Sequence, residues 1–209
     1  MINLTIKQLK VGFDNFAYVI FCPLTNKAAI VDPGYDSNKL IDYISSKNLF
    51  LDFIIATHYH NDHTKCIKNL KNEFQSSKIL TSEIDGKQLK LKIDKFVKEN
   101  EKIYLGKIQL TFIQTPGHTP GGICIIVDNE ALLTGDTLFI GDCGRTDLPG
   151  GSITNMFKTL KEKIMELPDH LIVYPGHDYG EKPFDTLGNQ KKTIKTLLAE
   201  SLEEFLKIP

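Results

Sequence analysis

The sequence predicts an α+β fold in which β-sheets are covered by helices. Short runs of β-branched and aromatic residues, bounded by turn residues, recur along the 209-residue chain. Segments with helical periodicity lie between many of these runs. No linker rich in Gly, Pro or Ser divides the chain, so we expect a single domain spanning residues 1–209.

The first part of the chain predicts a strand meander, then a helix and a buried strand. Turn residues separate the first two strands, and Pro33-Gly34 ends the third. Asp36 or Ser37 caps the helix that follows. The predicted strands cover residues 4–9, 16–21, 27–32 and 53–56, and the predicted helix covers residues 36–47.

Helical and strand patterns alternate through the rest of the chain. Ser152 caps a long helix, and the tail carries an apolar stripe of helical spacing. The predicted helices cover residues 63–72, 83–92, 152–167 and 187–206. The predicted strands cover residues 78–81, 101–105, 107–114, 123–127, 131–134 and 171–174. This mixture implies sheets with helices packed on them.

Charge and composition exclude several classes of protein. With 25 basic and 26 acidic residues, the chain lacks the broad positive surface of a protein that binds nucleic acid or an anionic membrane. The N-terminus lacks a signal-peptide pattern, and no stretch approaches the roughly 20 apolar residues of a membrane helix. We expect a cytoplasmic protein with no nucleic-acid or membrane partner; the sequence leaves open whether it is a monomer or a homodimer.

The four cysteines form no CxxC pair, so neither a zinc ribbon nor a dithiol redox motif is indicated. They are Cys22, Cys66, Cys124 and Cys143. We expect them to be reduced, with Cys22 and Cys124 in the core, where free cysteines are usually found.

A cluster of candidate metal ligands follows the apolar run at residues 53–56. It lies in the segment Thr57-His58-Tyr59-His60-Asn61-Asp62-His63. His58 and His60 are two positions apart, which points both imidazoles to the same side of an extended segment. Nitrogen and carboxylate ligands without a thiolate suit zinc, iron, manganese or nickel and are typical of catalytic sites. The cluster predicts a metal-dependent enzyme in which one or two ions activate water.

Three further candidate ligands come at the ends of other apolar runs. These are His118, Asp136 and His177. Loops at the carboxyl ends of strands are held by a rigid sheet, so side chains from separate strands can converge there. His170 lies outside this pattern, and we expect it to be an ordinary polar residue.

These motifs resemble those of the metallo-β-lactamase-fold superfamily. The resemblance rests on Thr57-His58-Tyr59-His60-Asn61-Asp62-His63, Thr115-Pro116-Gly117-His118-Thr119, Thr134-Gly135-Asp136 and Pro175-Gly176-His177. It implies an αββα sandwich of two mixed sheets flanked by helices, with the site at one edge. It also implies a first metal site formed by His58, His60 and His118, a second formed by Asp62, His63 and His177, and a bridging Asp136.

Two further segments look like those of glyoxalase II enzymes and their relatives, the persulfide dioxygenases. They are Gly135-Asp136-Thr137-Leu138-Phe139 and Cys143-Gly144-Arg145-Thr146-Asp147-Leu148-Pro149-Gly150-Gly151. The resemblance implies that Arg145 and Tyr179 bind the glutathione moiety. Lys65 and Cys66 replace the small residues usual in the family, and the sequence ends before the helical domain of the long glyoxalase II enzymes. The thiol carrier is therefore left open.

Two chemistries are compatible with this ligand set. The first is hydrolysis of a thioester such as S-lactoylglutathione by hydroxide formed at two divalent ions, zinc first and iron or manganese as alternatives, with Asp62 and Asp136 as catalytic residues. The second is oxidation of glutathione persulfide by a single Fe(II) held by His58, His118 and Asp136. Metal binding without turnover, and β-lactamase or phosphodiesterase activity, are further alternatives. The expected partner is a small-molecule thioester or thiol-derived substrate.

Overall fold

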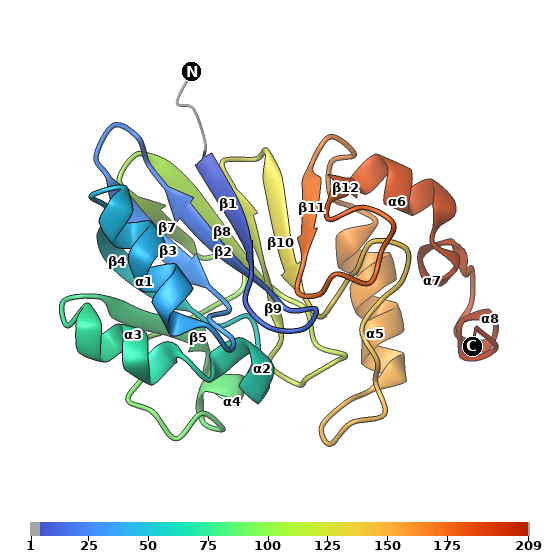
Figure 1. Cartoon of the computed structure of the whole chain (residues 1–209). Coiled ribbons are helices and arrows are strands. Elements are labelled where there is room, and N and C mark those ends of the chain that lie inside the picture. Colours follow the sequence, from blue (N-terminus) through green and yellow to red (C-terminus); the bar gives the residue numbers. More distant parts are fainter. Residues whose placement is uncertain (1–4, 209) are drawn as a thin grey trace.

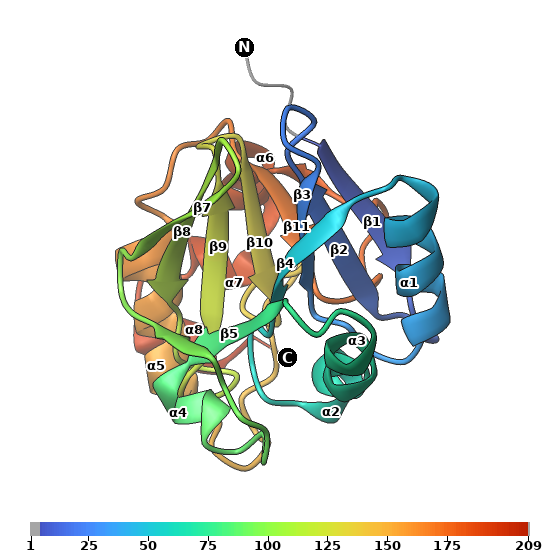
Figure 2. The same cartoon turned by 90° about the vertical axis from the view of Figure 1, so that its left-hand side faces the viewer.

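The computed structural model describes residues 5–208. Two six-stranded sheets pack against each other, and helices cover the outer face of each (Figure 1). In the view turned by 90°, strands β7 to β9 lie on the left of the molecule and strands β1 to β3 on the right (Figure 2). The predicted α+β class and αββα sandwich of two mixed sheets are confirmed.

The first sheet has the strand order β1-β2-β3-β4-β5-β6. Its first three strands are antiparallel, and β3 to β6 are parallel. The strands are β1 (Thr5–Lys10), β2 (Phe16–Phe21), β3 (Lys27–Val31), β4 (Phe50–Ile55), β5 (Lys78–Ser82) and β6 (Lys95–Val97). The helices of this half are α1 (Ser37–Ser46), α2 (Asn61–Thr64), α3 (Ile67–Glu73) and α4 (Glu83–Gly86). Leu4, predicted to start the first strand, lies outside the described residues.

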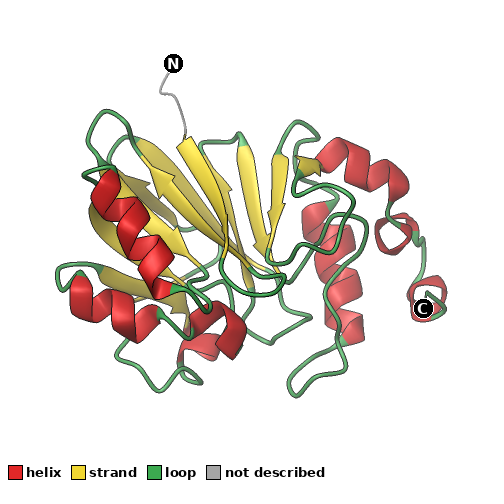
Figure 3. Cartoon of the chain, viewed as in Figure 1, coloured by secondary structure: helices red, strands yellow, loops and turns green. Residues whose placement is uncertain are grey.

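The second sheet has the order β12-β11-β10-β9-β8-β7, and β10 and β11 form its parallel pair. Its strands are β7 (Lys102–Leu105), β8 (Ile108–Gln114), β9 (Ile123–Val127), β10 (Ala131–Gly135), β11 (Ile172–Pro175) and β12 (Asp185–Thr186). The helices are α5 (Ile153–Thr159), the π-helix η1 (Leu160–Ile164), α6 (Leu187–Thr193), α7 (Lys195–Leu198) and α8 (Leu202–Leu206). Figure 3 shows helices on both flanks of the strands.

Three apolar layers hold the sandwich together. Along β2, Tyr18 and Ile20 face the second sheet, while Ala17 and Val19 belong to the layer under α1 and α3. A third layer lies between the second sheet and its helices and includes Leu160. Burying one large apolar side chain contributes about 1.5–3 kcal/mol. The alternation of inward and outward side chains therefore fixes which face of β2 packs against the second sheet.

The prediction of one continuous helix over residues 63–72 is wrong, because the helical segment starts earlier and is broken in two. Helix α2 begins at Asn61, and a break at Lys65 and Cys66 separates it from α3. The Cys66 amide donates to the carbonyl of Pro33 at 3.0 Å instead of continuing α2. This tertiary hydrogen bond turns the chain between the two short helices.

The helix predicted over residues 83–92 is also wrong beyond its first turn, because α4 ends at Gly86. Lys90 has a φ of 49°, which an α-helix does not accommodate. The following Leu91 and Ile93 instead pack against the outer apolar layer of the first sheet. The short strand β6, which the sequence pattern did not predict, comes next.

The two C-terminal helical predictions are correct in place but not in regularity. Ser152 caps α5 as predicted, but the helix continues as the π-helix η1. The helix predicted over residues 187–206 is broken into α6, α7 and α8, because Ile194 and Ala199 have extended ψ values of 119° and 124°. The strand β12 before them was not predicted.

The four cysteines are free, and Cys22 and Cys124 are buried, as predicted. Within residues 5–208, no helix combines the length and the apolar character that crossing a membrane requires.

Candidate metal centre

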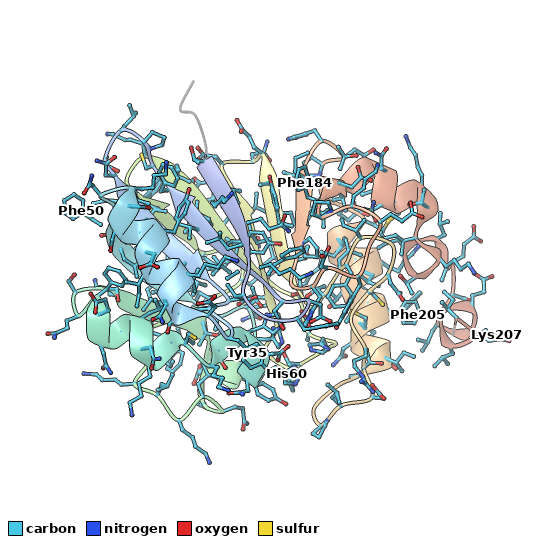
Figure 4. The ribbon with its side chains drawn as sticks, viewed as in Figure 1. Tyr35, Phe50, His60, Phe184, Phe205 and Lys207 are labelled. Carbon is cyan, nitrogen blue, oxygen red and sulfur yellow. The ribbon has the colours of Figure 1, made fainter. Side chains whose placement is uncertain are left out.

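The seven predicted ligands lie together at one edge of the sandwich, where strands of both sheets end. His58 follows β4, and His60 leads into α2. His118 lies between β8 and β9, Asp136 follows β10, and His177 follows β11. In Figure 4 the labelled His60 lies at the lower edge of the molecule, between the two layers of helices.

The first subsite consists of His58, His60 and His118. One nitrogen from each of these imidazoles lies within 4.8 Å of the others. His60 Nδ1 and His118 Nε2 are 2.9 Å apart, although the two residues come from different sheets. Three converging imidazoles are a common ligand set for zinc.

The second subsite consists of Asp62, His63 and His177, whose donor atoms also lie within 4.8 Å of one another. The Nε2 atoms of His63 and His177 are 3.1 Å apart. Asp62 Oδ2 lies 3.4 Å from each of these two nitrogens. The subsite therefore offers two imidazoles and one carboxylate.

The carboxylate of Asp136 lies between the two subsites and is 7% exposed. Its Oδ1 is 3.3 Å from His63 Nε2, and its Oδ2 is 3.4 Å from His118 Nε2. Oδ2 also lies 3.3 Å from His177 Nε2. One side chain thus contacts ligands of both subsites, which is the arrangement expected of a bridging group.

Two atoms of this cluster, His58 Nε2 and Asp136 Oδ1, are buried and lack a hydrogen-bond partner among residues 5–208. Buried polar atoms without partners are costly and therefore rare in folded proteins. Both atoms point into the cluster of nitrogen and carboxylate donors, a set that suits divalent transition metals. The residues therefore fit a centre of two metal ions.

Asp32 was not among the predicted site residues, but it supports the second subsite through a contact with His63. Its carboxylate accepts hydrogen bonds from the amide and the hydroxyl of Thr57, both at 2.7 Å. Its Oδ2 also lies 3.2 Å from His63 Nδ1. Asp32 follows β3 directly before Pro33-Gly34, so its position after a strand was the signal that could have identified it.

The turn between β1 and β2 supports the same subsite through contacts with two of its ligands. Asp14 Oδ1 lies 3.3 Å from His177 Nδ1. Asn15, which is 4% exposed, donates from Nδ2 to Asp62 Oδ2 at 2.9 Å. The local sequence indicates only a turn at these two residues, although each contacts a predicted ligand.

The histidines of the first subsite have neutral partners. His58 Nδ1 lies 3.0 Å from the hydroxyl of Thr57, and His118 Nδ1 lies 2.7 Å from the carbonyl of Arg145. Burial, assisted by the nearby His63, lowers the pKa of His58 well below its usual value. Burial also lowers the pKa of His60. Without metal, the imidazoles of His58 and His60 are neutral at pH 7.

The histidines of the second subsite are surrounded by carboxylates. Burial opposes a charge on His63, but Asp136 and Asp32 outweigh it and raise its pKa well above the usual value. Burial also acts against a charge on His177, yet the hydrogen bonds that it donates to Asp136 and Asp62 raise its pKa to about 9. Without metal, this subsite therefore carries protons at pH 7.

The two carboxylates of the centre are ionised. Burial acts to raise the pKa of Asp62, but hydrogen bonds from His177 and His63 hold it far below its usual value. Burial likewise acts to raise the pKa of Asp136, and the facing His63 outweighs it, so that the pKa is lowered. Both are thus available as anionic ligands.

A cavity of about 360 Å³ opens beside the centre, and it is lined by Arg145 and Tyr179, for which substrate binding stays a prediction. The Tyr179 ring stacks on His177, with ring centres 4.7 Å apart. Arg145 is the only arginine among 25 basic residues, and it forms a bidentate pair with Asp147, with Nε–Oδ1 and Nη2–Oδ2 distances of 2.7 Å. A larger cavity of about 770 Å³ adjoins the first and shares Phe139 and Tyr179 with it.

The sequence profile of the Metallo-beta-lactamase superfamily matches residues 12–177 of the chain. This protein belongs to that superfamily. The matched region contains all seven candidate ligands, from His58 to His177, and also Asp14, Asn15 and Asp32. The superfamily membership agrees with the observed sandwich and with a metal-binding cluster of His and Asp residues at its edge.

Relatives within the superfamily carry different enzyme names. The probable polyketide biosynthesis zinc-dependent hydrolase BaeB of Bacillus velezensis is 31% identical over 96% of this chain and 89% of its own length. A probable hydroxyacylglutathione hydrolase of Schizosaccharomyces pombe is 33% identical, covering 92% of this chain and 72% of its own. The mitochondrial persulfide dioxygenase ETHE1 of Homo sapiens is 30% identical, with coverages of 92% and 75%. The relatives are thus metal-dependent hydrolases or dioxygenases, and the cytoplasmic location stays a prediction.

His170 lies apart from this superfamily site. It is exposed, and its Nε2 lies 2.7 Å from the carbonyl of Asn129. It is therefore an ordinary polar residue, as expected from its place outside the strand-end pattern.

Proposed function

We propose that this protein is a two-metal thioester hydrolase of the glyoxalase II type. The proposal rests on the observation that each ligand of the second subsite contacts a further polar side chain that can orient it. Asp32 supports His63, Asp14 supports His177, and Asn15 supports Asp62. Such partners orient metal ligands and tune their basicity. A single iron held by His58, His118 and Asp136 would use none of these three contacts.

The chain would hold the ions through the seven ligands and supply the groups that direct the reaction. When bound, two divalent ions, zinc first and iron or manganese as alternatives, lower the pKa of water toward neutrality and polarise the substrate carbonyl. Asp62 lines the cavity, and the Asn15 amide fixes its orientation, so its carboxylate can accept a hydrogen bond from the attacking water. The C–S bond breaks with release of a thiolate, which is a good leaving group, so no strong general acid is needed.

The two adjoining cavities support a substrate with a long thiol carrier. We infer that the thioester carbonyl lies in the cavity of about 360 Å³ and that the carrier passes Phe139 and Tyr179 into the cavity of about 770 Å³. Both volumes are typical of small-molecule sites. An arginine at the rim can bind a carboxylate through two parallel hydrogen bonds. Arg145 therefore favours an anionic thioester such as S-lactoylglutathione, a small-molecule partner.

The second candidate is a persulfide dioxygenase. Asp136 Oδ2 lies 3.4 Å from His118 Nε2 and 4.0 Å from His58 Nε2. Two histidines and one carboxylate form the ligand set of many non-haem iron oxygenases. The similarity to the human protein named as a persulfide dioxygenase also supports this second candidate.

One experiment separates the two candidates. The full chain is purified without added metal, its metal is identified by mass spectrometry, and S-lactoylglutathione hydrolysis is assayed beside O2 uptake with glutathione persulfide. The proposal predicts thioester cleavage and no O2 uptake. Iron in the protein, O2 uptake and no thioester cleavage would overturn it in favour of the dioxygenase.

A further inference from the structure

Asp85 is a fully buried carboxylate next to the centre that is not one of the seven ligands. It lies in the short helix α4, directly after β5, and its exposed fraction is 0%. The hydroxyl of Ser82 caps this helix by accepting from the Asp85 amide at 3.2 Å. Within residues 5–208, no lysine or arginine forms an ion pair with Asp85. A carboxylate buried in this way is costly unless it is well hydrogen-bonded.

The hydrogen bonds of Asp85 go to two segments that carry ligands. Its Oδ2 accepts from the Tyr59 amide at 3.2 Å, and Tyr59 lies between His58 and His60. The same oxygen accepts from the Thr119 hydroxyl at 2.7 Å, and Thr119 follows His118. Its Oδ1 accepts from the Gly121 amide at 2.8 Å.

The two segments are far apart in sequence and come from different sheets. Residues 58–60 follow β4 of the first sheet, whereas residues 118–121 precede β9 of the second. Asp85 therefore joins the two sheets at the point where the three histidines of the first subsite must meet. A side chain at position 121 would collide with Asp85 Oδ1, so glycine allows this close approach.

We propose that Asp85 is a positioning residue that sets the separation of His60 from His118 and so builds the first metal subsite. This inference rests on the proposed metal centre, and it assigns Asp85 a role beyond stabilising the fold. Its carboxylate acts on the metal only through the backbone and hydroxyl groups that it holds. Supporting contacts of this kind decide whether a set of ligands is held within the tolerance that a metal requires.

The alternative is that Asp85 only stabilises α4 and the neighbouring loops. In that case its removal would lower the free energy of unfolding and leave metal binding unchanged. Asp94 provides a matched control, because it also accepts a backbone hydrogen bond beside β5, from Ile79 at 2.9 Å. Asp94 contacts neither of the two segments that carry ligands.

The test compares Co²⁺ and Zn²⁺ binding by the metal-free full-length protein and three variants, Asp85→Ala, Asp85→Asn and Asp94→Asn. Zn²⁺ affinity is measured for each binding step by competition with a chromophoric chelator. The visible absorption of the Co²⁺ form reports ligand number and geometry. We expect Asp85→Ala to weaken the first binding step by about 10–100-fold and to change the Co²⁺ spectrum. Asp94→Asn should do neither.

Asp85→Asn preserves the shape of the side chain and provides the test if the alanine variant does not fold. Its amide nitrogen cannot accept a hydrogen bond, so at least one of the three donors loses its partner. We expect a smaller loss of affinity in the same binding step. Wild-type affinity and spectrum in a folded Asp85 variant would overturn the positioning role alone. Failure of the unmodified protein to bind Co²⁺ would instead overturn the metal centre and the proposed hydrolase.

Discussion

The two subsites of the candidate metal centre differ in the groups that surround their ligands. In the first subsite, His58 and His118 contact a hydroxyl and a backbone carbonyl. In the second, His63 and His177 contact the carboxylates of Asp32 and Asp14. His58 and His118 therefore have neutral partners, whereas His63 and His177 have anionic ones.

The two subsites also differ in charge before metal binds. The pKa of His58 is lowered, so this imidazole is ready to bind an ion at pH 7. The pKa of His177 is raised to about 9, so an ion must displace its proton. We therefore expect the first subsite to accept metal over a wide pH range and the second to depend on pH.

The largest effect is expected where the two subsites meet. Asp136→Ala removes the carboxylate that contacts His63, His118 and His177, so both ions should be lost together with activity. The loss of metal affinity should exceed the roughly 100-fold upper range seen when only a supporting residue is changed. Metal content by mass spectrometry and thioester turnover test this, and retained turnover would contradict the bridging role.

A smaller and more selective effect is expected from Asn15→Ala. Among residues 5–208, its amide donates a hydrogen bond to Asp62 alone, so the second metal should bind about 10–100-fold more weakly while the first is unaffected. Phe13→Ala in the same turn is the control, because the Phe13 side chain is 93% exposed. Stepwise Zn²⁺ titration measures both affinities. Equal weakening of both steps would show that the two subsites are not supported separately.

The pH dependence of metal affinity tests the difference in charge. The raised pKa of His177, about 9, keeps it protonated at pH 7, so the affinity of the second step should rise as pH increases from 6.5 to 9 and then level off. The expected slope is about tenfold per pH unit for each proton displaced. The first step should be nearly flat over this range, since the pKa of both His58 and His60 is lowered. If the affinities of the two binding steps changed with pH in parallel, the proposed difference in charge between the subsites would be contradicted.

The smallest effect on activity is expected from a substitution of Arg145 at the rim of the cavity beside the metal centre. Arg145→Lys keeps the charge but loses the planar group that pairs with Asp147 and can hold a carboxylate through two hydrogen bonds. KM for an anionic thioester should rise by about tenfold, a change worth about 1.4 kcal/mol, while kcat changes little. A fall in kcat at unchanged KM would place Arg145 in the chemical step instead.

The sequence predicted the ligands better than their support. His58, His60, Asp62 and His63 are close together after a buried strand, and His118, Asp136 and His177 repeat the same strand-end position, so local pattern was sufficient. Asp14 and Asn15 have residue types typical of any turn. Their contacts with His177 and Asp62 arise only when the first hairpin packs beside β11. The contacts of Asp85 likewise exist only in the folded sandwich.

The same distinction explains which elements were predicted. Strands with alternating or continuous apolar residues, such as β2 and β9, match their predicted ranges. The helix predictions were wrong where tertiary contacts interrupt a helix. This happens at Cys66, whose amide donates a hydrogen bond to the carbonyl of Pro33. Helix α4 likewise ends early, at Gly86, and the positive φ of Lys90 excludes a helix at that residue, although the residue types favour one.

The most direct test of the two-subsite account is the number of ions bound per chain. The full-length protein is dialysed against Zn²⁺ at pH 7 and at pH 9, its metal content is measured by mass spectrometry, and thioester hydrolysis is assayed on the same samples. The account predicts two ions per chain at pH 9 and weaker occupancy of the second subsite at pH 7, with hydrolysis following the second ion. A single ion at both pH values with full thioester activity would contradict it.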